Sequence, residues 1–117
     1  KFGNHPQVNV HQVSITDWKP AYKYDAMVMA IPFNAIQHDL TKAIWLHSRT
    51  LMKPKAPVSY ISYIAFPALR AFFLTGADKA DYRRKIDFLK GQFAQYRIGK
   101  TEVMANLPPA NVYYMAF

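Results

Sequence analysis

A short apolar run that ends abruptly is the most informative stretch of the chain. Residues Asp25 to Ile31 read DAMVMAI, and Pro32, Phe33 and Asn34 follow directly. A short, continuously apolar run bounded by breakers is typical of a strand covered on both faces, as in a parallel sheet. Because proline cannot donate a hydrogen bond to a neighbouring strand, the strand should end at Pro32. The pattern predicts a central strand followed by a turn.

The pattern also predicts elements on either side of this run. Alternating residues over Val8–Ile15 predict a first strand, and a loop covers residues 18–24. Apolar residues near helical spacing predict a helix over His38–Met52, with Asp39 at its start. Residues Val58–Ala65 (VSYISYIA) are β-branched or aromatic in the main, which favours a further strand.

The C-terminal half begins with two predicted helices. Phe66-Pro67 starts a short one, since proline is tolerated in a first turn. The next carries a single apolar stripe, with members spaced by four, three and four residues: Tyr82, Ile86, Leu89 and Phe93. Two strands, Arg97–Ala105 and Asn111–Phe117, complete the chain, with a turn at Leu107-Pro108-Pro109.

Strands that alternate with helices predict an α/β fold with a parallel sheet, which here finishes in an antiparallel strand pair. The central strands Asp25–Ile31 and Val58–Ala65 should be parallel neighbours, with the last strand antiparallel beside the second of them. Ligands of such sheets bind just beyond the carboxyl ends of the strands. Pro32, Phe33 and Asn34 are therefore a candidate binding lip, and an ordinary turn is the alternative.

Composition narrows the class of protein. A chain of 117 residues that is 51% hydrophobic and 15% aromatic is one globular domain at most and is not disordered. It has no cysteine, which excludes disulfides and thiolate metal sites and permits a reducing compartment. No apolar run approaches the ~18 residues of a membrane span, and no signal peptide is visible. The four histidines lack metal-ligand spacing, so we expect no metal.

Positive charge is concentrated in one region. Twelve of the fifteen Lys and Arg residues lie between residues 42 and 100, where only three aspartates oppose them. Such a region is typical of a surface that binds nucleic acid or an anionic membrane. A solvated basic face without a partner is the alternative. The segment 79–100 holds the densest part: Lys79, Arg83, Arg84, Lys85, Lys90, Arg97 and Lys100.

Three stretches resemble a known family. They are Ala30–Asn34 (AIPFN), Tyr60–Arg70 (YISYIAFPALR) and Asn106–Tyr113 (NLPPANVY), of which the last is the most specific. Together they resemble bacterial phospholipid N-methyltransferases of the soluble phosphatidylethanolamine type. The similarity spans most of the chain and matches the C-terminal half of a Rossmann-like class I S-adenosylmethionine-dependent methyltransferase sheet. The resemblance implies S-adenosylmethionine as cofactor and a phospholipid headgroup amine as substrate.

The chain departs from that family at its start. The glycine-rich loop that cradles the methionine end of the cofactor is absent, along with the first two strands of the sheet. The four glycines form no cluster, and the chain starts on Lys1 rather than Met. We therefore expect residues 1–117 to be a partial methyltransferase domain. Alone, it should bind S-adenosylmethionine weakly or not at all and be inactive.

The resemblance also implies where the cofactor would lie. Its adenine should lie near Ser14 and Ile15, and its sulfonium near Ile31 and Pro32. Ser14 stands where the family usually carries an acid, and a hydroxyl accepts the adenine hydrogen bond less strongly than a carboxylate. These four residues are the expected cofactor contacts.

Transfer of a methyl group from a sulfonium requires little beyond an aligned, neutral amine and exclusion of water. Asn34 can accept a hydrogen bond from that amine, and Phe33 can pack against the developing cation. They are the candidate catalytic residues. Tyr60 and Tyr63 are candidate substrate contacts. Because they lie on opposite faces of one strand, at most one should face the site.

Three functions remain open from the sequence. The resemblance favours a phospholipid N-methyltransferase that is cytoplasmic and held at the inner face of the membrane by the segment 79–100. The lip Ile31–Ile36 (IPFNAI) also looks like that of rRNA adenine dimethyltransferases, where the aromatic residue stacks on a flipped base. Ala30 departs from that pattern. A non-catalytic basic α/β module is the third reading.

Overall fold

A computed structural model describes residues 6–63, 76–105 and 109–117 of the chain. Its two α-helices are α1 (His38–Thr50) and α3 (Gly76–Tyr96). Four strands form one sheet in the order β1-β2-β4-β3: β1 (Met27–Met29), β2 (Pro57–Tyr63), β3 (Arg97–Val103) and β4 (Ala110–Ala116). Two single turns of 3₁₀-helix, η1 (Ile15–Asp17) and η2 (Phe33–Ala35), precede β2.

The strand directions confirm the predicted sheet. β1 runs parallel to β2, with Met27 opposite Val58. β4 lies antiparallel on the other edge of β2, with Tyr60 opposite Tyr113, and β3 pairs antiparallel with β4. A parallel pair connected through α1 and a closing antiparallel pair make this the α/β arrangement that the sequence predicts.

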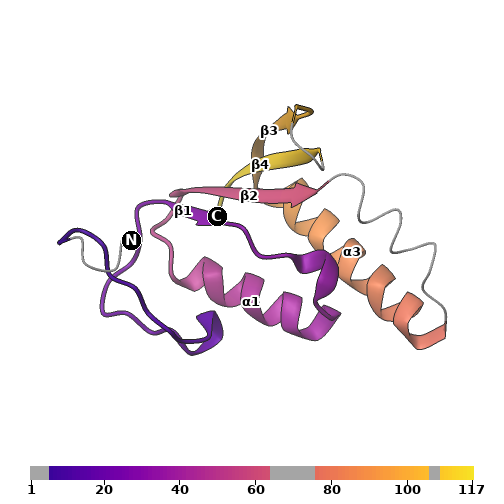
Figure 1. Cartoon of the computed structure of the whole chain (residues 1–117), viewed down its shortest axis with the longest axis horizontal. Coiled ribbons are helices and arrows are strands. Elements are labelled where there is room, and N and C mark those ends of the chain that lie inside the picture. Colours follow the sequence, from indigo (N-terminus) through magenta and orange to yellow (C-terminus); the bar gives the residue numbers. More distant parts are fainter. Residues whose placement is uncertain (1–5, 64–75, 106–108) are drawn as a thin grey trace.

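Both helices lie on the same face of the sheet (Figure 1). Side chains on that face are buried, with Met29, Val58 and Met115 each at most 2% exposed. On the opposite face Val28 is 75% exposed. Within the described residues that second face has no helical layer, as the incomplete sheet predicts.

Aromatic side chains fill the space between helices and sheet. Trp45 of α1 is fully buried, and its ring contacts Phe33, Tyr60, Phe93 and Phe117 with centroids 5.7–5.9 Å apart. Such tilted and edge-to-face pairs add roughly 0.5–1.5 kcal/mol each beyond area burial. One tryptophan therefore joins the turn after β1, strand β2, helix α3 and the C-terminus.

Two predicted strands are corrected. Residues 8–13 form no strand, and Ile15 starts η1 instead. Val10 is 72% exposed, because no described strand offers this segment a partner and an isolated strand is not stable. The central strand shortens to Met27–Met29, since its outer edge is also unpaired in the described part of the chain.

The predicted helices agree more closely. α1 ends at Thr50 rather than Met52. In α3 the predicted stripe faces inward at Tyr82 and Leu89, but Lys85 is equally buried, at 2% exposed, and so is not part of a basic surface. The short helix expected from Phe66-Pro67 lies outside the described residues, as do parts of two of the stretches that carry the family resemblance.

The glycines of α3 offer a test of this helix. A Cβ built at Gly91 meets no atom within 4 Å, whereas Gly76 has a φ of +59°. Gly91→Ala should stabilise the protein by about 0.5–1 kcal/mol, because alanine restricts the unfolded chain and favours the helix. Chemical unfolding of the full-length protein measures this change.

Gly76→Ala is the matched control. It should destabilise the same helix, since an L-residue is strained at positive φ. Equal effects of the two substitutions would contradict the helix geometry described here.

Candidate functional site

A small pocket lies at the carboxyl ends of the two parallel strands. Its volume is about 80 Å³. Two segments line it, one following β1 and one at the end of β2: Ala30, Ile31, Pro32 and Asn34, then Tyr60, Ile61 and Ser62. The structure thus brings together four residues that the sequence singles out: Ile31, Pro32, Asn34 and Tyr60.

The segment after β1 turns sharply. Pro32 has no N–H to continue the ladder, and η2 follows at once, with the Ala35 amide donating to the Pro32 carbonyl at 2.9 Å. The Ile36 amide donates to the Phe33 carbonyl at 3.3 Å. This turn places Asn34 at the pocket wall, directly before α1.

Phe33 is a core residue in the structure. Its side chain is 1% exposed, and its ring packs on Trp45 and Tyr60 rather than lining the pocket. Its expected packing against a substrate cation stays a prediction. The turn directs this apolar ring into the core, where it contacts the rings of Trp45 and Tyr60. The buried ring therefore fixes the position of the lip relative to the core.

The pKa of the Tyr60 phenol is raised above its usual value. Burial raises its pKa to about 12, although a hydrogen bond from the Ser62 hydroxyl acts in the opposite direction. The phenol therefore stays neutral at physiological pH. Tyr63 belongs to β2 and pairs with Ala110, and its side chain lies outside what the structure describes.

Helix α3 holds the lip through two residues that the sequence did not indicate as part of the site. The Lys85 Nζ donates to the backbone carbonyls of Ile36 at 2.7 Å and Asn34 at 3.3 Å. The Asp81 carboxylate accepts from the His38 amide at 3.0 Å, at the start of α1. The only sequence signal is their spacing of four residues, which puts both on the side of α3 that carries the apolar stripe.

A second amide lies at the same edge of the sheet. Asn111 is opposite Ser62, which lines the pocket, and its Nδ2 lies 3.5 Å from the Tyr113 hydroxyl. The Asn111 Oδ1 is buried and has no donor among the described residues. Two polar residues, Ser62 of β2 and Asn111 of β4, are therefore paired across the strands at the pocket.

Ser14 and Ile15 lie elsewhere. The Ile15 carbonyl accepts from the Trp18 amide, and the Trp18 carbonyl lies 2.7 Å from His47 Nε2, near the C-terminal end of α1. The lip is at the other end of that helix, roughly 14 Å away along nine residues of helical rise. The structure thus places Ser14 and Ile15 at the end of α1 opposite to the lip, and their contact with the adenine of the cofactor stays a prediction.

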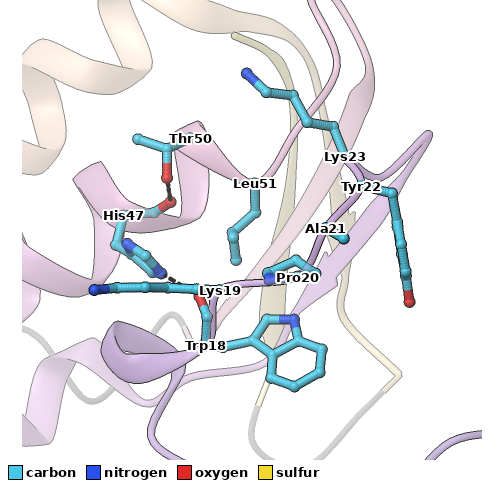
Figure 2. Close-up of a pocket in the computed structure, with 9 residues that line it drawn as sticks. All are labelled: Trp18, Lys19, Pro20, Ala21, Tyr22, Lys23, His47, Thr50 and Leu51. Carbon is cyan, nitrogen blue, oxygen red and sulfur yellow. Dashed lines mark hydrogen bonds between the residues drawn. The ribbon is translucent and has the colours of Figure 1, made fainter.

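A larger hollow accompanies this second location. It has a volume of about 280 Å³ and lies between the loop from Trp18 to Lys23 and the last turn of α1 (Figure 2). Among the residues that line it are Lys19 and Tyr22 of the loop and His47 of α1 (Figure 2). Since this hollow is at the end of α1 remote from Asn34, the two cavities are separate.

The described residues fit only one end of S-adenosylmethionine. The pocket near Ile31 and Pro32 is well below the ~300–1,000 Å³ typical of small-molecule sites, and can take a methyl group and an amine. Ser14 is exposed, its hydroxyl 2.8 Å from that of Thr16, and no glycine-rich loop is present.

Two features of the described residues bear on metal binding and on membrane spanning. Across residues 6–63, 76–105 and 109–117, no group of three or more His, Asp or Glu side chains could hold a metal ion. None of the helices described is both long and apolar enough to cross a membrane.

Comparison with known proteins bears on the fold. No protein-family model and no curated protein matches the chain. Among solved structures, the N-methyltransferase NodS from Bradyrhizobium japonicum WM9 matches with a TM-score of 0.59 and 13% sequence identity. The match covers 89% of this chain and 56% of that one. At this identity the similarity shows a shared fold, and it confirms the predicted methyltransferase-like part-sheet.

The Tyr60 phenol provides a test of this site. Its folded pKa lies above the usual value of 10, so its contribution to stability is complete below pH 10 and is lost as the pH rises through 12. Between pH 10 and 12 the free energy of unfolding should fall by roughly 2–3 kcal/mol more in the wild type than in Tyr60→Phe. Urea unfolding at several pH values measures this difference.

Tyr60→Phe also controls for the other groups that titrate in this range. The absorbance change of phenolate formation should show one late-titrating tyrosine that Tyr60→Phe lacks. Parallel pH dependences in the two proteins would show that Tyr60 is not buried as described.

Proposed function

We propose that this chain is part of an S-adenosylmethionine-dependent N-methyltransferase that acts on the headgroup amine of a phospholipid such as phosphatidylethanolamine. The observation that carries the proposal is the pocket at the carboxyl ends of β1 and β2, lined by Pro32 and Asn34. It lies in a fold shared with an N-methyltransferase, at the edge where α/β sheets bind ligands. The three stretches that resemble phospholipid N-methyltransferases support the choice of acceptor.

The pocket suits the reaction. When bound, S-adenosylmethionine would supply the methyl group: the amine nitrogen would form a bond to the methyl carbon as the bond from that carbon to the sulfonium sulfur breaks. The sulfonium would leave as a neutral thioether, and a proton would pass from the methylated nitrogen to water. The amine must therefore arrive neutral. None of the described residues that line the pocket carries a carboxylate, so none of them favours the ammonium form of the amine. The side-chain oxygen of Asn34 can accept a hydrogen bond from an N–H of the amine, and this bond would orient the lone pair of the amine nitrogen.

The burial of Phe33 bears on the nucleic-acid alternative. An rRNA adenine methyltransferase of the kind considered above needs the aromatic residue of the lip to stack on a flipped base. The Phe33 ring is instead enclosed by Trp45 and Tyr60 and is 1% exposed. This placement favours the phospholipid reading over the nucleic-acid one.

The basic segment supplies the proposed membrane contact. Six of its seven Lys and Arg residues are exposed, all except Lys85: Lys79, Arg83, Arg84, Lys90, Arg97 and Lys100. Two are partly neutralised, Arg84 by Asp81 at 3.3 Å and Lys100 by Glu102 at 2.9 Å. Near an anionic bilayer each free cation contributes about 1 kcal/mol, so a few suffice for reversible binding. We place the protein at the cytoplasmic face of the membrane on this basis.

Removing charge from α3 tests the membrane contact. Replacing Arg83, Arg84 and Lys90 with glutamine should weaken binding of the full-length protein to phosphatidylglycerol-containing vesicles by roughly 10- to 100-fold. Raised salt should release the wild type, because such attraction is screened over about 8–10 Å. Vesicle co-sedimentation measures both effects.

The matched control neutralises three exposed lysines outside the segment: Lys19, Lys23 and Lys55. It removes the same charge and should leave vesicle binding nearly unchanged. An equal loss in both triple variants would mean that net charge, rather than the face of α3, drives the binding.

Asn34 tests the transfer step. Asn34→Ala in the full-length protein should lower the rate of methyl transfer about 10- to 100-fold, the loss of one hydrogen bond to the acceptor, and should spare vesicle binding. Asn9→Ala, at an exposed position remote from the pocket, is the control. Labelled cofactor offered to mixed phosphatidylethanolamine vesicles and RNA together identifies the acceptor. Label in RNA and none in lipid would end the phospholipid proposal.

A further inference from the structure

We propose that the outer edge of β3 is a docking surface for a second copy of this chain, and that antiparallel pairing of the two β3 strands joins two sheets into one. The occupant of the surface is thus the same strand of an identical molecule, related by a two-fold axis at Thr101. The charge pattern of β3 and the exposed apolar side chains at its ends carry the proposal. It concerns assembly and does not depend on the chemistry at the Asn34 pocket.

The strand β3 has an edge that accepts a partner. It is the outermost strand of the sheet, at the end opposite to β1 (Figure 1). One side of it pairs with β4, and no strand among the described residues pairs with the other side. Six of its seven residues are exposed. Because every second residue of such an edge directs its backbone N–H and C=O outward, the edge is a template for one more strand.

Apolar side chains are exposed at both ends of this strand. Ile98 is 69% exposed, and Met104, which follows the strand directly, is 64% exposed. When two copies of β3 run antiparallel, the start of one strand lies beside the end of the other. Ile98 of each copy then lies beside Met104 of the second copy, and both side chains lose apolar area to water. That burial favours the pairing.

The charges between these ends select one register. Lys100 and Glu102 are two residues apart, so they lie on the same face of the strand, and Lys100 Nζ is 2.9 Å from Glu102 Oε1. With Thr101 opposite Thr101 of the second copy, Lys100 of each copy lies opposite Glu102 of the other. Four charges then alternate in sign around a square. A cross-strand pair of opposite charges stabilises a sheet.

Neighbouring registers lack this complementarity. A slip of two residues is the smallest that keeps the faces of the two sheets matched. In one direction it places Lys100 opposite Lys100 of the second copy, and in the other it places Glu102 opposite Glu102. Like charges directly opposite each other are destabilising. The sequence of β3 therefore favours pairing about Thr101 over the registers on either side.

Charged side chains on an edge strand can also serve to prevent pairing, which is the alternative role for Lys100 and Glu102. Charges of one sign would serve that role best, since they repel every identical edge. The strand instead carries one charge of each sign at positions that the two-fold axis exchanges. Arg97, at the start of β3, lies opposite Ala105 of the second copy in this register and so meets no like charge directly.

Charge reversal tests the pairing in the full-length protein. The wild type should have twice the mass of one chain in sedimentation equilibrium at about 100 µM, which detects dissociation constants of that order or below. Lys100→Glu and Glu102→Lys should each be monomeric, because each variant places like charges opposite each other at both contacts. Lys23→Glu, at an exposed position outside β3, is the control and should stay dimeric.

A mixture of the two variants identifies the register. The two glutamates of Lys100→Glu lie opposite the two lysines of Glu102→Lys, so an equimolar mixture should form a heterodimer. The double variant that carries both substitutions exchanges the charges and keeps their pattern, so it should form a homodimer again. A general loss of stability in the single variants would not be reversed by mixing.

Cross-linking keeps the wild-type charges. Residues directly opposite each other in an antiparallel pair have Cα atoms about 4.5–5.5 Å apart. A short bismaleimide should therefore link two copies of Thr101→Cys, and the 117 residues contain no cysteine of their own. Asn9→Cys, at an exposed position in the N-terminal segment, should remain unlinked.

The outcomes are distinct. A monomeric wild type, single variants that remain dimeric, or a Thr101→Cys protein that is not linked would overturn the proposal. Monomeric single variants that combine into a heterodimer support it. Because none of these measurements involves methyl transfer, failure of the dimer would leave the proposed function standing, and absence of methyl transfer would leave the dimer standing.

Discussion

The candidate site depends on the hydrogen bonds that α3 makes to the segment between β1 and α1. Lys85 binds two carbonyls of that connection and Asp81 binds the first amide of α1. Further along the same helix, Gln92 accepts a hydrogen bond from the Trp45 indole at 3.0 Å. Because buried polar groups are costly when unpaired, these bonds specify one register of α3 against α1. The lip is therefore a tertiary feature rather than an isolated turn.

The aromatic core works with these polar contacts. Phe33 enters it from the lip and Tyr60 from β2, so the walls of the pocket and the centre of the core share residues. A packed interior transmits small displacements, because it has few voids to absorb them. The geometry at Asn34 consequently depends on packing around Trp45, which no local sequence feature near Pro32 reveals.

The sheet is covered by helices on one face only. Val28 and Tyr114 are exposed on the other face, whereas parallel sheets in α/β proteins are buried on both faces. The chain also spans 56% of the length of NodS, whose fold it shares. These two observations agree with the methyltransferase-like part-sheet that the sequence predicts.

The sequence by itself determined the central strands, the helix between them and the closing strand pair. Continuous apolar runs and chain breakers are local signals. They predict an element correctly where an adjacent strand or helix buries the apolar run. It failed at residues 8–15, because alternation predicts a strand only where another strand can pair with it. It also singled out Pro32 and Asn34, through the rule that α/β sheets bind ligands at the carboxyl ends of their strands, and Tyr60 as a candidate substrate contact; all three line the pocket.

Tertiary structure alone decided the rest. Phe33 turns inward because aromatic partners far along the chain receive it, and Ser14 lies away from the lip because η1 binds the other end of α1. In the sequence Lys85 is one of several basic residues in the segment 79–100, but in the structure its side chain is buried. Only the fold brings the carbonyls of Asn34 and Ile36, some fifty residues earlier, within reach of its ammonium. Contacts of that sequence separation leave no periodic signal, so the structure was needed to find them.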